Sequence, residues 1–293
     1  MSVFMQLLVN GLIAGSIYML VASGFSLIYS VNKFQNFAIG SMVAFAGYMT
    51  YLFYSKLAIG HFLLVIPLVI VATIILGLAL DFVVFRQLRR RNASYTVMMI
   101  ASLALLTLLS SLLLIAFSSD VKIIKANNVS HEILGARMTD IQLFIIAASI
   151  LVIAFLYWIS FRTKIGKAMR ALADNKDVAQ IVGIDPEKVY MVTAILASLL
   201  AGVAGILIGM ENNLYPQMGL MLIVKGFAAS IMGGVGLLHG TVLGSYLLGF
   251  AENFGIWYIP SGYKDAISFM LLFVFLLFRP YGLLGRKKRE DVS

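Results

Sequence analysis

Apolar stretches of roughly twenty residues, most of them uncharged, recur along this chain and constrain its fold more than any other feature. A helix of about 20 apolar residues crosses about 30 Å of hydrocarbon. The candidate spans are Met5–Tyr29, Phe37–Leu57, Phe62–Leu80, Tyr95–Phe117, Ile141–Phe161, Val189–Met210 and Gly262–Phe278. An interrupted pair, Gly219–Met232 and Thr241–Phe254, is broken by glycines. The pattern predicts an all-α polytopic membrane protein with about eight to nine passes, including one glycine-broken hairpin.

Composition excludes the main alternatives. Of the 293 residues, 61% are hydrophobic and 12% are charged, whereas soluble domains carry about 25% charged residues. A soluble globule could not cover so much apolar surface, and the chain has no cysteine for a disulfide scaffold. The first stretch is too long for a signal-peptide core and lacks a basic flank, so we expect a mature helix.

Basic residues predict the orientation. Fifteen of the 22 lysines and arginines fall on one side if the spans alternate. They follow the third, fifth and last spans: Arg86, Arg89, Arg90, Arg91, Arg162, Lys164, Lys167, Arg170, Lys176, Lys188, Arg279, Arg286, Lys287, Lys288 and Arg289. Cytoplasmic loops are enriched in such residues. The N-terminus is then outside, residues 118–140 form an external loop, and the basic tail 279–293 is cytoplasmic. The pair at 219–254 must cross twice, or dip in and return.

The sequence lacks the common motifs for nucleotide binding, nucleophilic catalysis and metal binding. There is no GxxxxGK[ST] loop for nucleotide phosphates and no GxSxG around a serine. The histidines, His61, His131 and His239, are far apart, so we expect no metal site. We interpret the positive charge as a topology signal, not as a nucleic-acid surface. The chain is predicted to be neither an enzyme nor a cofactor-binding protein.

The loop 162–188 is predicted to be a structured helical elbow. Ile165, Met169, Leu172 and Ala173 fall on one face of a short helix. A second short turn ends at Gly183, a residue suited to the left-handed position after a helix. Asp185 and Pro186 then read as the cap and first residue of the next span. The elbow either lies on lipid headgroups or docks into a groove on a cytoplasmic partner.

Two ionisable residues lie inside the interrupted pair. Lys225 and Glu252 are costly in an apolar segment unless they are paired or face water. Along straight helices they lie toward the same membrane face, without being clearly in contact. A structural ion pair, an exposed position at a mouth and a substrate contact all remain open.

Two glycine-rich breaks resemble each other at a shift of 204 residues. The matched positions are Ser26, Val31, Gly40 and Ser41 with Ser230, Val235, Gly244 and Ser245. Internal repeats with broken helices are common in transporters. The alternative is two helices that both need small residues for close packing.

Several ordered motifs resemble one family over nearly the whole chain. They are Asn10-Gly11-Leu12, Gly15-Ser16-Ile17-Tyr18, Asn36-Phe37-Ala38 before Gly40, Arg162 through Ile184, Ala201-Gly202-Val203-Ala204-Gly205, Lys225-Gly226-Phe227, Met232-Gly233-Gly234-Val235-Gly236, Leu248-Gly249-Phe250-Ala251-Glu252 and Arg279-Pro280-Tyr281-Gly282-Leu283. The set resembles the permease subunits of branched-chain amino-acid ABC importers, whose relatives carry urea and amides.

The resemblance implies a function and partners. It implies a single permease domain over residues 1–293, in the cytoplasmic membrane of a prokaryote. A second homologous permease would complete a heterodimer, two cytoplasmic ATP-binding subunits would hydrolyse ATP, and an external binding protein would deliver the substrate. The substrate would be a branched-chain or other neutral amino acid; a urea or amide importer is the alternative, and a self-sufficient channel or secondary carrier is a more remote one.

The residue patterns and the resemblance together give the candidate sites. Coupling to the ATPases would fall on the elbow residues Met169, Arg170, Ala171, Ala173, Asp174, Asn175 and Gly183. Asn36, Ser41, Lys225 and Glu252 are candidates for the translocation path or for structural roles. The family usually carries a histidine and an acid where this chain has Ile39 and Ser41, a departure that bears on the substrate and leaves the elbow match intact.

The predicted orientation can be tested with single cysteines at Ser2, Asn128 and Ser293, because the chain has no native cysteine to remove. An impermeant thiol reagent should label the first two positions in intact cells. Ser293 should react only after permeabilisation. Labelling of Ser293 from outside would overturn the charge-based orientation.

Overall fold

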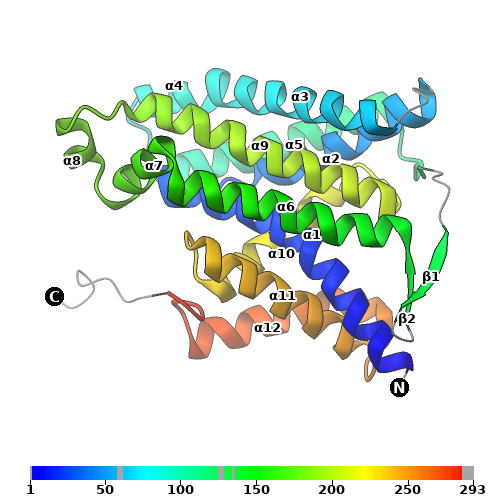
Figure 1. The fold of residues 1–293 in the computed structure, drawn as a ribbon. Coiled ribbons are helices and arrows are strands. Elements are labelled where there is room, and N and C mark those ends of the chain that lie inside the picture. Colours follow the sequence, from blue (N-terminus) through cyan, green and yellow to red (C-terminus); the bar gives the residue numbers. More distant parts are fainter. Residues whose placement is uncertain (1, 58–61, 125–128, 134–135, 286–293) are drawn as a thin grey trace.

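The computed structural model describes residues 2–57, 62–124, 129–133 and 136–285, and most of them are helical (Figure 1). The α-helices are α1 Ser2–Asn32, α2 Ala38–Thr50, α3 Phe62–Leu80, α4 Arg86–Arg90, α5 Tyr95–Phe117, α6 Asp140–Arg162, α7 Lys164–Asp174, α8 Lys176–Ile181, α9 Pro186–Glu211, α10 Met218–Gly233, α11 Leu238–Gly255 and α12 Lys264–Phe278. Two π-helical turns, Tyr51–Lys56 and Asp81–Phe85, continue α2 and α3. A short 3₁₀ turn, Ser261–Tyr263, precedes α12.

Local sequence signals explain where several helices begin. The Ser94 side chain accepts the amide hydrogen of Val97 at the start of α5. Thr139 and Gln142 form a reciprocal capping box at the start of α6. Such caps satisfy amide groups that have no partner within the helix. The spans therefore begin at polar residues placed immediately before the apolar runs.

α1 and α9 form the centre of the bundle, and the other long helices surround them. Most residues of α1 and α9 are buried, whereas α3, α5, α6 and α12 expose apolar side chains along much of their length. Examples of these exposed side chains are Ile75, Ile115, Leu151 and Phe273. Apolar side chains facing outward all along a helix are typical of a surface that contacts lipid.

Six helices of the described residues are long and apolar enough to cross a membrane, and the bent α10–α11 pair could be a seventh. The six are Val3–Asn32, Phe62–Arg90, Tyr95–Phe117, Asp140–Arg162, Pro186–Glu211 and Ser261–Phe278. The stretch predicted at 37–57 is helical but is not among them. The chain is a multi-pass helical membrane protein, and the predicted count of eight to nine passes stays a prediction.

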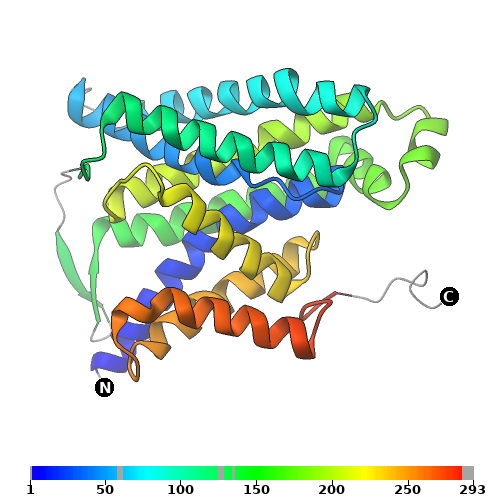
Figure 2. The same cartoon turned by 180° about the vertical axis from the view of Figure 1, so that it is seen from behind.

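The bundle has two distinct ends. At one end, the basic end, lie α4 and the α7–α8 elbow, and the chain leaves α12 toward the C-terminus (Figures 1 and 2). At the other, the hairpin end, lie the start of α1 and the strands β1 (Ser130–Ile133) and β2 (Ala136–Thr139). The basic residues of α4 and of the elbow, together with Arg279, thus share one end. Residues 286–293, which include four of those basic residues, lie outside the described residues.

The two strands correct the all-α prediction. β1 and β2 pair as an antiparallel hairpin within the loop 118–140, with His131 opposite Met138. The Gln6 side chain exchanges two hydrogen bonds with the backbone of Arg137 and so joins the hairpin to the start of α1. This contact spans 131 residues of sequence, so a local reading of the loop could not reveal it.

The α10–α11 pair enters and leaves at the hairpin end. The two helices bend by 117° at the break, and the backbone amide of Gly236 there donates to Ser26 Oγ near the far end of α1. Phe254, at the other end of α11, packs on Phe4. The arrangement agrees with the requirement that this pair cross twice or dip in and return.

Glycines allow the broken helices to touch. A Cβ on Gly40 would lie 2.2 Å from the carbonyl oxygen of Gly219, and one on Gly244 would lie 2.1 Å from that of Ala229. Both glycines therefore serve close helix packing against α10. The shift of 204 residues pairs Val31, inside α1, with Val235, inside the break. The structure thus supports the packing interpretation of the shared small residues.

Candidate functional site

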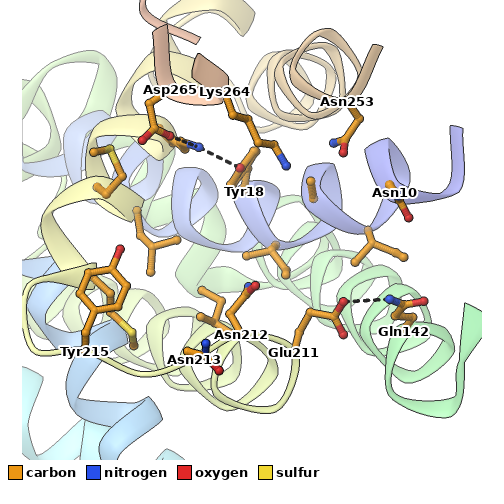
Figure 3. Close-up of a pocket in the computed structure, with 18 residues that line it drawn as sticks. Asn10, Tyr18, Gln142, Glu211, Asn212, Asn213, Tyr215, Asn253, Lys264 and Asp265 are labelled. Carbon is orange, nitrogen blue, oxygen red and sulfur yellow. Dashed lines mark hydrogen bonds and ion pairs between the residues drawn. The ribbon is translucent and has the colours of Figure 1, made fainter. Parts of the chain in front are cut away.

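A polar cavity of about 670 Å³ lies at the hairpin end, where α1, α6, α9, α10, α11 and α12 converge (Figure 3). Its polar lining consists of Asn10, Tyr18, Gln142, Glu211, Asn212, Asn213, Tyr215, Lys225, Asn253, Lys264 and Asp265. Its apolar lining consists of Ile13, Ala14, Ile17, Ile208, Met218, Met221 and Leu222. The cavity thus offers cations, carboxylates and amides beside aliphatic walls.

A buried carboxylate anchors one wall of this cavity. Glu252 is fully buried. Its carboxylate accepts a hydrogen bond from the Tyr18 hydroxyl at 2.7 Å and a second from Ser268. Lys225 Nζ lies 3.0 Å from the same carboxylate. A buried charge is tolerable only when such partners replace its water shell.

Lys225 extends this cluster to the cavity surface. Its ammonium lies 2.8 Å from Asp265 Oδ1, and Lys264 lies 3.8 Å from Glu252 Oε2. Lys225, Lys264 and Asp265 line the cavity, whereas Glu252 stands behind them. The structure therefore brings Lys225 and Glu252 into contact, and of the three interpretations left open the ion pair describes their geometry. Lys225 additionally has access to a solute.

The sequence left this contact open, because straight-helix distances from the break do not account for how α10 and α11 lean together. A Cβ on Gly233 would lie 1.8 Å from the Gly240 carbonyl oxygen, so the helices cross almost backbone to backbone. The long lysine side chain then spans the remaining gap. Asp265 and Ser268 come from α12, a helix that sequence spacing does not connect to this pair.

The opposite wall of the cavity carries an acidic group and amides. Glu211, the last residue of α9, accepts a hydrogen bond from Gln142 Nε2 at 2.8 Å (Figure 3). Asn212 and Asn213 follow it along the rim. Sequence reasoning missed this wall and missed Asp265. The available signal was the cluster of polar residues that ends the Val189–Met210 stretch and the Lys264–Asp265 pair that opens the last one.

The structure keeps two other candidates away from this cavity. Asn36 Oδ1 accepts the amide hydrogen of Ala38, and Ser41 Oγ donates to the Ala38 carbonyl. Both side chains are buried where α1 gives way to α2. Their contacts in the structure satisfy the backbone of this break.

The elbow has the predicted local structure. α7 is capped by Thr163, α8 is capped by Asn175, and Asp185 caps α9 with Pro186 next to it. Gly183 has φ of +85°, and no atom lies within 4 Å of the position a Cβ would take there. The left-handed backbone alone therefore favours glycine at this turn.

Part of the predicted apolar face of α7 is buried against the bundle. Met169 and Leu172 are buried and Ala173 is partly buried, but Ile165 is 46% exposed. Gly166 takes the inner position instead, because α7 doubles back on α6 so closely that a Cβ there would lie 2.2 Å from the Ile159 carbonyl oxygen. Ile165 thus lies on the exposed side of α7, whereas Met169 and Leu172 pack on the bundle.

The outer surface of the elbow is polar with an apolar patch. Val178, Ile181 and Val182 are all exposed, Ile181 by 83%. Asp174 and Asn175 lie beside this patch at the joint between α7 and α8. Arg170 donates to the Ser160 carbonyl and stacks over Phe161, with 5.2 Å to the ring centre. The guanidinium thus holds α7 against α6.

Comparison with known proteins identifies the class and then the family. Apolar helices with a polar cavity at one end and a structured elbow at the other are the architecture of a multi-pass membrane permease. Residues 7–276 match the family model described as branched-chain amino acid transport system / permease component. The chain belongs to this family.

Relatives match along the whole chain. BraD of Pseudomonas aeruginosa, a high-affinity branched-chain amino acid transport system permease protein, is 31% identical over 99% of this chain and 98% of its own. LivH of Escherichia coli K12 is 30% identical over the same shares. LivH of Methanocaldococcus jannaschii is 31% identical over 96% of this chain and 92% of its own.

A solved structure shares the fold. PsaBC from Streptococcus pneumoniae in complex with Fab superposes with a TM-score of 0.53 and 14% identity, over 93% of this chain and 91% of the other. At this identity the likeness concerns the fold alone.

The Glu252 cluster generates a testable prediction. Lys225→Met leaves the buried carboxylate with Lys264, at 3.8 Å, as the nearest cation of the described residues. Stranding one partner of a buried pair costs about 3–5 kcal/mol, whereas removing both charges costs much less. Lys225→Met should therefore lower the melting temperature of the purified protein more than the Lys225→Met, Glu252→Gln double change. Asp265→Asn, at the 45% exposed partner, is the matched control and should be mild. Additive losses would show that Lys225 and Glu252 act independently.

Proposed function

We propose that this chain is one transmembrane subunit of an ATP-driven importer that moves branched-chain or other neutral amino acids inward across the cytoplasmic membrane of a prokaryote. The observation that carries the proposal is the cavity at the hairpin end. It places ammonium groups of Lys225 and Lys264 and a carboxylate of Glu211 around aliphatic walls. A zwitterion with an apolar side chain complements all three features. The full-length likeness to BraD and LivH supports the same substrate class.

The proposed orientation places this cavity outside and the elbow in the cytoplasm. The positive charge of α4, the elbow and Arg279 at the basic end supports it. With α2 and its π-helical turn counted as a span, seven helices cross, and the α10–α11 pair, which enters and leaves at the same end, either crosses twice or dips in and returns. Residues 118–140 then lie outside and the tail 279–293 lies inside, within one transmembrane domain.

The proposed partners are a second homologous permease, two cytoplasmic ATP-binding subunits and an external binding protein. The chain itself has no nucleotide-binding loop, so the energy must come from another subunit. The exposed apolar patch on α8 supports a docked partner, because such residues are costly in water. An external binding protein would reach the cavity from the hairpin end.

Coupling to the ATPases is assigned to Met169, Arg170, Ala171, Ala173, Asp174, Asn175 and Gly183. Met169 is buried and Arg170 stacks on Phe161, so both hold α7 on the bundle. Ala171 and Ala173 are small enough for a partner surface to approach closely. Asp174 and Asn175 are exposed at the joint and can hydrogen-bond to that surface. Gly183 lets the chain turn sharply into α9, so that a push on α7 is delivered to the start of a central helix.

The test is uptake in proteoliposomes that contain the permeases, the ATP-binding subunits and the binding protein. Wild type should take up leucine only with ATP, and this chain alone should neither hydrolyse ATP nor transport. Ala173→Trp should insert and fold, because the position lies outside the spans, yet block the approach of the ATPases and abolish uptake. Gly183→Val should do the same by straining a left-handed backbone at about 1 kcal/mol or more.

Gly183→Asn is the matched control, because asparagine tolerates a positive φ, and it should transport. Robust leucine uptake by the lone chain would contradict the proposed function. Normal transport by both Ala173→Trp and Gly183→Val would contradict the coupling role and leave the elbow as a helix on lipid headgroups.

A further inference from the structure

One arginine at the basic end binds two carboxylates from different helices. Arg89 Nη1 lies 2.9 Å from Asp81 Oδ1, and its Nη2 lies 3.1 Å from Glu187 Oε2. Its guanidinium also lies 4.7 Å from the centre of the Tyr190 ring. Four hydrogen bonds join Arg89 to the two carboxylates. These residues, Asp81, Arg89, Glu187 and Tyr190, are called the Arg89 clamp below.

The clamp differs from ordinary surface ion pairs. The Arg89 side chain is 9% exposed, whereas Lys188, in an ion pair with Asp185 near the same turn, is 80% exposed. Exposed pairs hold nothing firmly, because water and salt compete with them. The Asp81 side chain is 11% exposed and that of Glu187 is 38% exposed, so Arg89 binds one shielded and one partly exposed carboxylate. A planar guanidinium that forms paired hydrogen bonds with each carboxylate fixes both distance and orientation. The clamp is thus a rigid joint.

The two carboxylates belong to different segments of the bundle, one next to the elbow and one at the end of α3. Glu187 is the second residue of α9, immediately after the elbow. Asp81 opens the π-helical turn that continues α3. π-Helical turns are rare in proteins, and those that occur are often found at functional sites. The clamp therefore ties the exit of the elbow to an irregular point of a neighbouring span.

Packed aromatic rings lead onward from this point. Phe85, at the end of the π-helical turn, lies 5.2 Å from the Phe34 ring in the break between α1 and α2. Phe37, in the same break, lies 5.7 Å from the Phe227 ring of α10. Phe227 follows Lys225 of the cavity wall by two residues. Two ring contacts, joined by the short backbone segment from Phe34 to Phe37, thus connect the π-helical turn with α10, the helix that carries Lys225.

We propose that Arg89 is a positioning residue for transport, which makes the start of α9 and the π-helical turn of α3 move as one unit. A displacement of the elbow then reaches the α1–α2 break and α10 through the aromatic contacts. Without the clamp, α9 moves alone, and the displacement does not reach the α1–α2 break and the α10 wall of the cavity. This inference rests on the proposed function, because it assigns a route to the coupling.

The test separates transmission from folding with two variants of the clamp. Glu187→Gln removes the link to the elbow and keeps the shielded Arg89–Asp81 pair, so the fold should persist. Arg89→Lys keeps the positive charge but cannot bind both carboxylates in fixed geometry. In the proteoliposomes described above, each variant should hydrolyse ATP at nearly the wild-type rate. Uptake per ATP should fall by about tenfold, the usual range of a coupling free energy.

Arg86→Gln is the matched control. Arg86 contacts the same Glu187, but at 3.7 Å and with 35% of its side chain exposed, so its loss should change uptake per ATP less than about twofold. Wild-type uptake per ATP in both clamp variants would overturn the inference. So would a parallel loss of uptake, hydrolysis and bound ATPases, because that pattern means a purely structural role. Absence of ATP-driven uptake in wild type would instead contradict the proposed function.

Discussion

Lipid cannot hydrogen-bond to a peptide group, and this constraint governs where the chain can leave the helical conformation. Two breaks interrupt the bundle, and the protein itself satisfies both. At the first, the Ser102 hydroxyl accepts from Phe37 and donates to the Gln35 carbonyl. At the second, the Leu283 and Leu284 amides donate to the last carbonyls of α10, at 2.8 and 3.2 Å. Each break is therefore hydrogen-bonded to a helix or segment that is distant in sequence.

The same constraint governs the charges. Glu252 is fully buried, and it is held by Tyr18 from α1, Lys225 from α10 and two residues of α12. The helices α1, α10, α11 and α12 thus meet at one carboxylate. These contacts fix the wall of the cavity. The basic end has a corresponding joint in the Arg89 clamp. In the proposed coupling, these two joints are the points between which a displacement would be transmitted.

Local signals made much of the chain predictable. Spans follow from apolar length, and the elbow follows from its caps, from the left-handed Gly183 and from Pro186 at the start of α9. The cavity could not be predicted in the same way, because Glu211, Lys225 and Asp265 meet only after α9, α10 and α12 have packed. The buried side of α7 could not be predicted either, because the position of α6, and not the periodicity of α7, decides that Gly166 lies inside while Ile165 is exposed. The strand hairpin depends on Gln6, more than a hundred residues away in sequence.

In the proposed function, ATP hydrolysis and substrate entry lie at opposite ends of this chain, and a structure of the assembled importer with an ATP analogue tests that most directly. It should show an ATP-binding subunit seated on α7 and α8, with the cavity of Glu211, Lys225 and Asp265 at the far end beneath the external binding protein. An ATP-binding subunit seated at the hairpin end, against β1 and β2, would contradict the orientation and the coupling role together.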